Sequence, residues 1–79
     1  MNEKVQLTKD EIIMGFVASC IEDVADTIGV DYLEVYRRMD AVNMIDEYII
    51  PNYEVLHSES RKNVTGGLID TLKRWEEAE

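Results

Sequence analysis

The stretch LTKDEIIMGFVASCIEDVADTIGV, residues 7–30, decides the fold because it specifies one long helix together with both of its ends. Thr8 and Glu11 have the spacing of a capping box, in which each side chain accepts a hydrogen bond from the other residue's free backbone N–H. Gly29 suits the left-handed conformation that closes a helix. We therefore expect a helix over Lys9–Ile28.

Apolar residues within this stretch recur every three or four positions, which is the period of one helix face. They are Ile13, Phe16, Val17, Cys20, Ile21, Val24, Ala25 and Ile28. Leu7 and Ile12 match a hydrophobic staple around the cap. Because Cys20 falls inside the apolar face, we expect a buried, unreactive thiol with a raised pKa.

A second helix is expected over Tyr32–Ala41. Asp31 and Glu34 repeat the capping pattern, and Val30 and Val35 repeat the staple. The apolar face of this helix is short and is flanked by tyrosines. Its members are Val35, Met39 and Val42, with Tyr32 and Tyr36 beside them.

A third helix is expected to start at Asn43, as a side-chain cap followed by Asp46 and Glu47 in the first turn. Its inner face would use Ile45, Tyr48, Ile49 and Leu56. Pro51 lacks an N–H and clashes with the preceding turn, so the helix either kinks there or stops and restarts. We favour the kink.

The last helix is expected from about Arg61 to Glu77. Apolar residues at successive turns define it: Val64, Leu68, Leu72 and Trp75. Gly66 and Gly67 inside it are either a weak point or a place of close helix approach. No alternating strand pattern occurs. The sequence therefore predicts an all-α fold: a compact single-domain bundle of about four helices over residues 9–77, after an N-terminal segment of residues 1–8.

Charge and composition narrow the classes of function. The 79 residues hold 8 Lys plus Arg against 17 Asp plus Glu, a net charge of -9. Such a surface repels phosphates, so nucleic-acid binding is unexpected, while a basic protein partner is favoured. A single cysteine indicates a reducing compartment, and no apolar run approaches the length of a membrane span. We expect a cytoplasmic protein without membrane association, and a homo-oligomer stays open.

The sequence contains no motif that is typical of a catalytic site. One cysteine and one histidine, Cys20 and His57, cannot supply the ligands of a zinc site, and no glycine-rich phosphate loop is present. Cys20 with His57 could form a nucleophile and base, but the position of Cys20 in an apolar face favours packing. We therefore expect no enzyme activity, no catalytic residue, no metal and no cofactor.

Tyr53, His57 and Arg61 are spaced four residues apart. If one helix runs through them, they share a face and form a candidate binding patch. If the helix breaks near Ser58, His57 lies at a helix end, where its charge favours the negative dipole. These three residues therefore either serve only to cap and pack helices, or form a polar patch that recognises a partner through the charge change of His57.

The run Phe16, Val17, Cys20, Ile21 and Glu22, followed by Tyr36 and then by Tyr53 to Ser58, resembles a bacterial family catalogued as domain of unknown function 3791. The resemblance covers about residues 11–75. It departs from the family pattern at Thr65, Gly66 and Gly67, where an acidic, helix-favouring stretch is expected. Members of that family look to be encoded near proteins that resemble ADP-ribosyltransferase toxins, so the resemblance implies an antitoxin or accessory role.

The leading hypothesis is a non-enzymatic protein-interaction module, antitoxin-like or accessory, that sets an acidic helical face against a basic partner. The alternative is a helical DNA-binding regulator, and a small hydrolase comes third. The regulator would depend on isolated basic pairs: Arg37 with Arg38, Arg61 with Lys62, and Lys73 with Arg74. Residues 10–59 carry 12 acids and 2 bases, which disfavours a groove-binding helix there.

Overall fold

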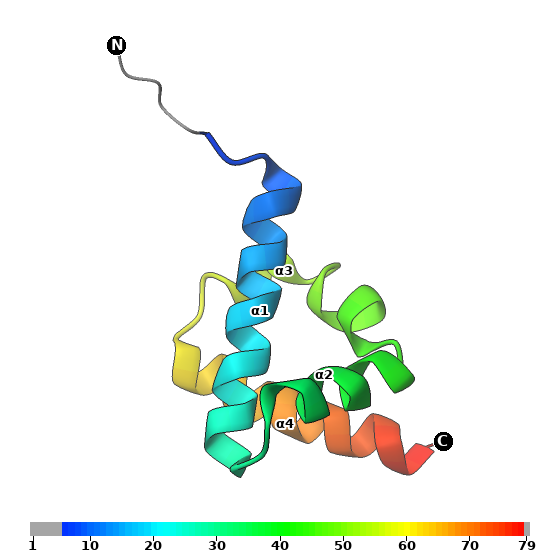
Figure 1. The fold of residues 1–79 in the computed structure, drawn as a ribbon. Helices are drawn as coiled ribbons and strands as arrows, with labels where there is room; N and C mark the ends of the chain where they lie inside the picture. The colour runs from blue at the N-terminus through cyan, green and yellow to red at the C-terminus, as the bar shows by residue number, and fades with distance from the viewer. Residues whose placement is uncertain (1–5, 79) are drawn as a thin grey trace.

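The computed structural model describes residues 6–78, and five helical segments lie within them (Figure 1). They are α1 (Lys9–Ile28), α2 (Tyr32–Ala41), the π-helical η1 (Ile45–Ile49), α3 (Tyr53–Leu56) and α4 (Arg61–Ala78). No strand occurs in these residues. The predicted all-α, compact fold is confirmed, with three long helices and two short segments where about four helices were expected. Residues 1–5 of the expected N-terminal segment lie outside the described residues.

The predicted start and end of α1 are confirmed. The Glu11 N–H donates to Thr8 Oγ1 at 3.1 Å, and the Thr8 N–H donates to Glu11 Oε1 at 2.8 Å. At the other end, Gly29 has a φ of 75° and its N–H donates to the carbonyl of Ala25 at 2.9 Å. Only glycine adopts this backbone conformation at no steric cost, so the residue ends the helix.

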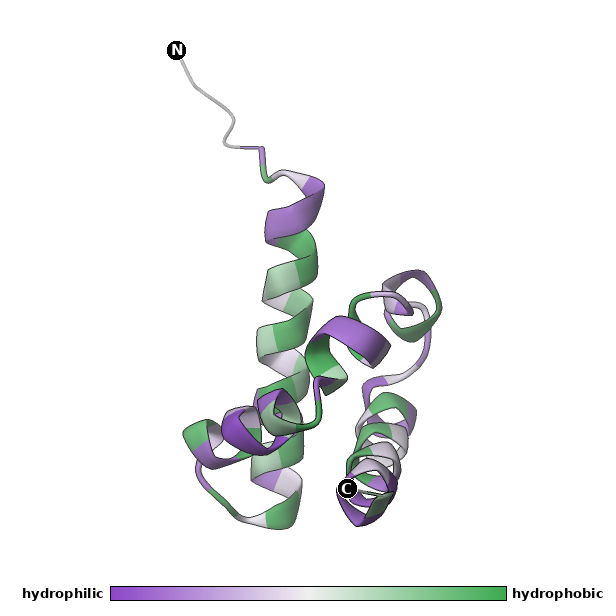
Figure 2. Cartoon of the chain, turned by 90° about the vertical axis from the view of Figure 1, so that its right-hand side faces the viewer, coloured by the Kyte–Doolittle hydropathy of each residue, from purple (hydrophilic) through white to green (hydrophobic). Residues whose placement is uncertain are grey.

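One core forms where α1 packs against both α2 and α4. All the long helices and both short segments contribute to it. The buried apolar residues are Val17, Cys20, Ile21, Val24, Ala25, Val35, Met39, Met44, Ile45, Ile49, Leu56, Val64, Leu68 and Leu72. Figure 2 shows the apolar residues of α1 continuing beyond this core toward its N-terminal end.

The bounds predicted for α2 are confirmed, but its expected capping box is not formed. Asp31 occupies the N-cap position without any side-chain hydrogen bond, and only its carbonyl accepts from the N–H groups of Glu34 and Val35. Asp31 is exposed, so water competes for its carboxylate. Burial of Val35 and Met39, both completely inaccessible, therefore holds the helix in place.

The expected side-chain cap at Asn43 is wrong. Asn43 adopts a positive φ of 58° and turns the chain from α2 into η1, whose N-cap residue is Met44 without a side-chain cap. Asparagine tolerates this left-handed conformation better than most residues. The residue therefore acts as a turn and not as a cap.

The favoured kink at Pro51 is also wrong, because the helix stops and restarts. The last η1 bond runs from the Ile50 N–H to the Ile45 carbonyl at 3.0 Å, and Pro51 has no N–H to continue the ladder. Asn52 Nδ2 instead donates to the carbonyl of Tyr48 at 2.7 Å. A turn follows, and α3 begins at Tyr53.

The last helix starts after Ser60, whose Oγ accepts from the Asn63 N–H at 3.2 Å. It continues to Ala78, one residue beyond the prediction, without a break at Gly66 and Gly67. A Cβ placed on either glycine would meet no atom within 4 Å. Of the two alternatives, close helix approach is therefore excluded, and a weakening of the helix by the glycines stays a prediction.

Among the described residues, no helix combines the length and the apolar character needed to cross a bilayer.

Candidate interaction surface

Tyr53 and His57, two residues of the predicted patch, stack on each other. Their ring centroids lie 4.5 Å apart and their planes differ by 12°. Tyr53 begins α3, and His57 is the residue that ends it. The helix therefore breaks before Ser58, and His57 lies at a helix C-terminus, where a positive charge is favourable.

Residues of α1 and α3 surround this stack. The ring of Phe16 meets Tyr53 edge to face at 5.3 Å. Glu54 Oε1 lies 3.7 Å from His57 Nε2, and Glu54 Oε2 accepts from Lys9 Nζ at 2.8 Å. The hydrogen bond and charge of Lys9 hold the pKa of Glu54 below its ordinary value. Glu54 is thus ionised at neutral pH beside the histidine.

Arg61, the third residue of the predicted patch, turns toward α1. Its guanidinium binds Asp23 through two bonds, Nε to Oδ2 at 3.0 Å and Nη2 to Oδ1 at 2.7 Å. This bidentate bond raises the pKa of Arg61. Arg61 and His57 line one groove of about 240 Å³, so the patch is continuous across the gap between α3 and α4. Its role in recognition stays a prediction.

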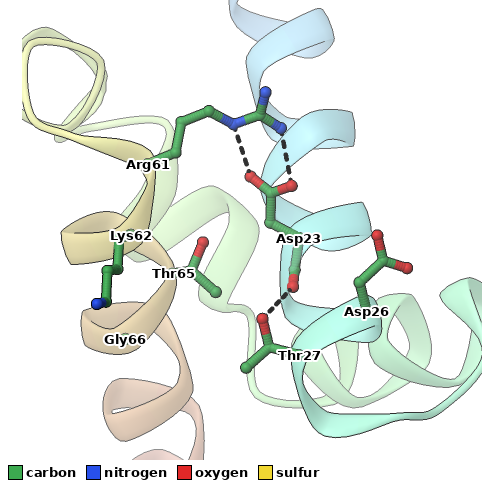
Figure 3. Close-up of a pocket in the computed structure, with 7 residues that line it drawn as sticks. All are labelled: Asp23, Asp26, Thr27, Arg61, Lys62, Thr65 and Gly66. Carbon is green, nitrogen blue, oxygen red and sulfur yellow. Dashed lines mark hydrogen bonds and ion pairs between the residues drawn. The ribbon is translucent and has the colours of Figure 1, made fainter.

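A wider groove of about 550 Å³ adjoins the first on the other side of the Asp23–Arg61 pair. Figure 3 shows Arg61 reaching across it to Asp23, while Lys62 extends away from both carboxylates of the opposite helix. The lining residues are Asp23, Asp26 and Thr27 from α1 and Arg61, Lys62, Thr65 and Gly66 from α4. Side chains of both charges line this groove, and two of them, Arg61 and Asp23, neutralise each other in an ion pair.

Cys20 is buried as predicted, with 3% of its surface exposed. Burial, assisted by the charge of Asp23, raises the pKa of the thiol to about 11. The thiol is therefore protonated at neutral pH, and a protonated thiol is a poor nucleophile. Within residues 6–78, no cluster of acidic, histidine or cysteine side chains has the geometry of a metal site.

The charged side chains of α1 after Lys9, and those of the first turns of α2, are all acidic. Between residues 10 and 36 the chain has no Lys, Arg or His. The carboxylates of this segment are Asp10, Glu11, Glu22, Asp23, Asp26, Asp31 and Glu34. Among the described residues, only Asp23 of these is bound to a cation. The other six carboxylates are exposed and form no ion pair within the described residues, so this segment carries a net negative field.

An exposed apolar cluster at the start of α2 was not predicted. Tyr32 is 39% exposed, Leu33 52% and Tyr36 42%, and Val30 lies just before them in the connection from α1. The available signal was helical spacing. Tyr32 and Tyr36 are one turn apart and lie between the buried face and Leu33, which is three positions from Tyr36, so their exposure depended on what covers the buried face.

Arg38 holds α2 against α4. Its Nε and Nη2 each donate to a carboxylate oxygen of Glu76 at 2.8 Å. This pairing raises the pKa of Arg38 and lowers the pKa of Glu76. Two of the six cations that a DNA-binding helix would use, Arg38 and Arg61, are therefore engaged within the fold.

The fold and these surfaces define a small, acidic, all-α protein with grooves on either side of the Asp23–Arg61 pair. A family model described as a protein of unknown function, DUF3791, matches residues 15–75. The chain belongs to this family. No curated protein and no solved structure matches it.

The two segments that carry the family resemblance meet in space. Phe16 contacts Tyr53, and Cys20 lines the same groove as His57. Residues 65–67, where we expected a departure from the family pattern, lie within an uninterrupted α4, with Thr65 buried. Phe16, Cys20, Tyr53 and His57 thus lie in one region where α1 meets α3.

Proposed function

We propose that this protein is a non-enzymatic interaction module that receives a more basic protein on its acidic surface. The observation that carries the proposal is the uncompensated charge of residues 10–36, where six exposed carboxylates have no cation partner among the described residues. A field of one sign steers an oppositely charged partner and raises its association rate.

The chemistry of the grooves supports a binding role over a catalytic one. Cys20, the only thiol, is buried and held protonated. Arg38 and Arg61 are already bound to carboxylates, which leaves fewer cations for phosphates and favours a protein partner over nucleic acid. His57 is instead placed at an accessible groove edge, stacked on Tyr53 and close to Glu54.

The biological role that we propose is that of an antitoxin or accessory protein for a toxin-like enzyme in a bacterial cytoplasm. The support for this role is the family resemblance and its implied genomic neighbourhood. A single cysteine suits a reducing compartment.

The test has two steps. The tagged chain is first isolated from its native host together with any bound protein, and the association rate of the two purified proteins is then measured at rising salt concentrations. We expect the rate to fall as screening shortens the reach of the field to about 8 Å at physiological ionic strength. Neutralising two exposed acids, Glu22→Gln with Asp26→Asn, should slow association further. An association rate that changes neither with salt concentration nor in the double variant would contradict the proposal.

A second measurement asks whether the Tyr53, His57 and Arg61 patch takes part. His57→Ala should weaken partner binding more than it weakens folding if the patch contacts the partner. If His57 only ends α3, the variant loses about 1 kcal/mol of stability and keeps its affinity. The melting temperature and the dissociation constant of the same variant separate these outcomes.

A further inference from the structure

We propose that the start of α2 is the docking surface for a cationic, amphipathic helix of the partner. The inference rests on the proposed function and deepens it by naming the surface and the chemistry that fits it. The surface consists of Val30, Tyr32, Leu33 and Tyr36, and it is called the α2 patch below.

The α2 patch lies away from the core-facing residues of its helix. Val35 and Met39 are fully buried against the core, whereas the four patch residues are between 37% and 52% exposed, with Leu33 the most exposed. Tyr32 and Tyr36 are separated by one turn, about 6 Å along the axis. Leu33 lies beside them on the exposed side of the helix. The patch therefore presents two aromatic rings and two aliphatic side chains together.

Aromatic and aliphatic side chains of this kind are typical of the buried core of a protein–protein interface. Tyrosine buries a large area at low entropic cost and is enriched among residues that dominate binding energy. An amphipathic helix would place its apolar residues against Leu33 and Val30. Its Lys or Arg side chains could then lie over the rings of Tyr32 and Tyr36, where the electron-rich faces attract cations.

Charge complementarity selects a cationic occupant. Asp31 and Glu34 are sequence neighbours of the patch residues, and Asp40 continues the row of Tyr32 and Tyr36 by one further turn; all three are exposed. Arg37 is the one free cation beside them within the described residues, because Arg38 is bound to Glu76. The rim is therefore net negative, and it continues the acidic surface of α1.

The probe for the test is a fluorescent synthetic peptide of about 18 residues, with leucine on one helical face and lysine on the other, roughly 27 Å long when helical. Its binding to the full chain is followed by fluorescence anisotropy at physiological salt. We expect Leu33→Lys to weaken binding by about tenfold or more, because it removes an apolar anchor and adds repulsion. Tyr36→Ala should act in the same direction.

Met14→Lys is the matched control. Met14 is also 52% exposed and also lies on a helix, so the variant makes the same change of charge and size away from the α2 patch. We expect it to weaken binding by about threefold or less, through the general field alone. A second peptide with glutamine in place of leucine should bind more weakly than the first. Melting temperatures identify any variant that is not folded.

Equal loss of affinity in Leu33→Lys and Met14→Lys would overturn the inference, because binding would then depend on net charge alone. No binding of the peptide to the unmodified chain would overturn it too. Either result leaves the proposed function to its own test with the native partner. If the native partner shows no salt dependence while the peptide binds the α2 patch, the proposed function fails and the docking surface stands.

Discussion

The two halves of α1, Lys9–Phe16 and Val17–Ile28, both carry apolar side chains at helical spacing, yet only the second half is buried. All the buried residues of α1 fall in Val17–Ile28, where α2 and α4 cover it. In the first half, Ile12 and Met14 remain 44% and 52% exposed. The first turns of α1 extend past the ends of α2 and α4 in both views (Figures 1 and 2).

This difference shows that a helical pattern predicts the helix but not its burial. Burial requires another element on the apolar side, and residues distant in sequence supply that element. The first half depends instead on its capping box and on two contacts with α3 near the surface, the edge contact of Phe16 with Tyr53 and the Lys9–Glu54 pair. We expect the two halves to respond differently to the same substitution.

The largest expected difference is between Ile21→Ala and Ile12→Ala. Ile21 is 2% exposed, so truncation leaves a cavity and should lower the free energy of unfolding by about 2–5 kcal/mol. Ile12 is 44% exposed, and its truncation should cost about 1 kcal/mol or less. Urea unfolding of both variants measures this. Similar losses would mean that the first half is as well packed as the second.

Capping should matter more at the start of α1 than at the start of α2. Thr8→Ala removes the hydrogen bond to the Glu11 N–H and should cost about 1 kcal/mol. Asp31→Ala removes no side-chain cap and should change stability by about 0.5 kcal/mol or less. Thermal melts of the two variants provide the comparison. A larger loss in Asp31→Ala would show that its carboxylate caps α2 in solution.

Glycine substitutions in the two halves should have opposite signs. Gly15 lies in the first half, and a Cβ there meets no atom within 4 Å, so Gly15→Ala should raise stability by about 0.5–1 kcal/mol. Gly29 ends the second half at a φ of 75°, and Gly29→Ala should lower stability by about 1 kcal/mol. Chemical denaturation shows the sign of each change. A destabilised Gly15→Ala would reveal a neighbour at that site.

The smallest expected effect concerns the ion pair between α2 and α4, the helices that cover the second half. Glu76→Gln should cost about 1 kcal/mol or less at neutral pH, because the pair is partly exposed. The pKa of Glu76 is lowered in the folded state, so its stabilisation is present above the ordinary carboxyl range and is lost as pH falls through the lowered pKa.

The difference in stability between Glu76→Gln and the unmodified protein should therefore shrink as the pH is lowered through that range. Glu77→Gln, an exposed neighbour, is the control and should show a smaller difference at every pH. A Glu76→Gln difference that persists in strong acid would point to packing and not to charge. Melts across a pH series decide between these causes.

Half of the candidate site was predictable and half was not. Tyr53 and His57 were expected on one face if a helix ran through them, or with His57 at a helix end; the helix ends at His57, and the two rings still stack because four-residue spacing brings them together within a single turn. The engagement of Arg61 by Asp23 could not be anticipated, since 38 positions separate the two residues in the sequence. The exposure of Tyr32 and Tyr36 was equally hidden, because it depends on what the rest of the fold leaves uncovered.

The sequence alone determined where α1, α2 and α4 begin and end to within a residue, and it placed Cys20 in the core. Caps, closing glycines and apolar periodicity act between residues three to five positions apart, so the local sequence contains this information. Only the tertiary structure decided that the chain breaks at Pro51, that Asn43 turns the chain, and that the first half of α1 stays open. Those outcomes depend on contacts between distant segments, and the free energy of such contacts cannot be read from a local sequence pattern.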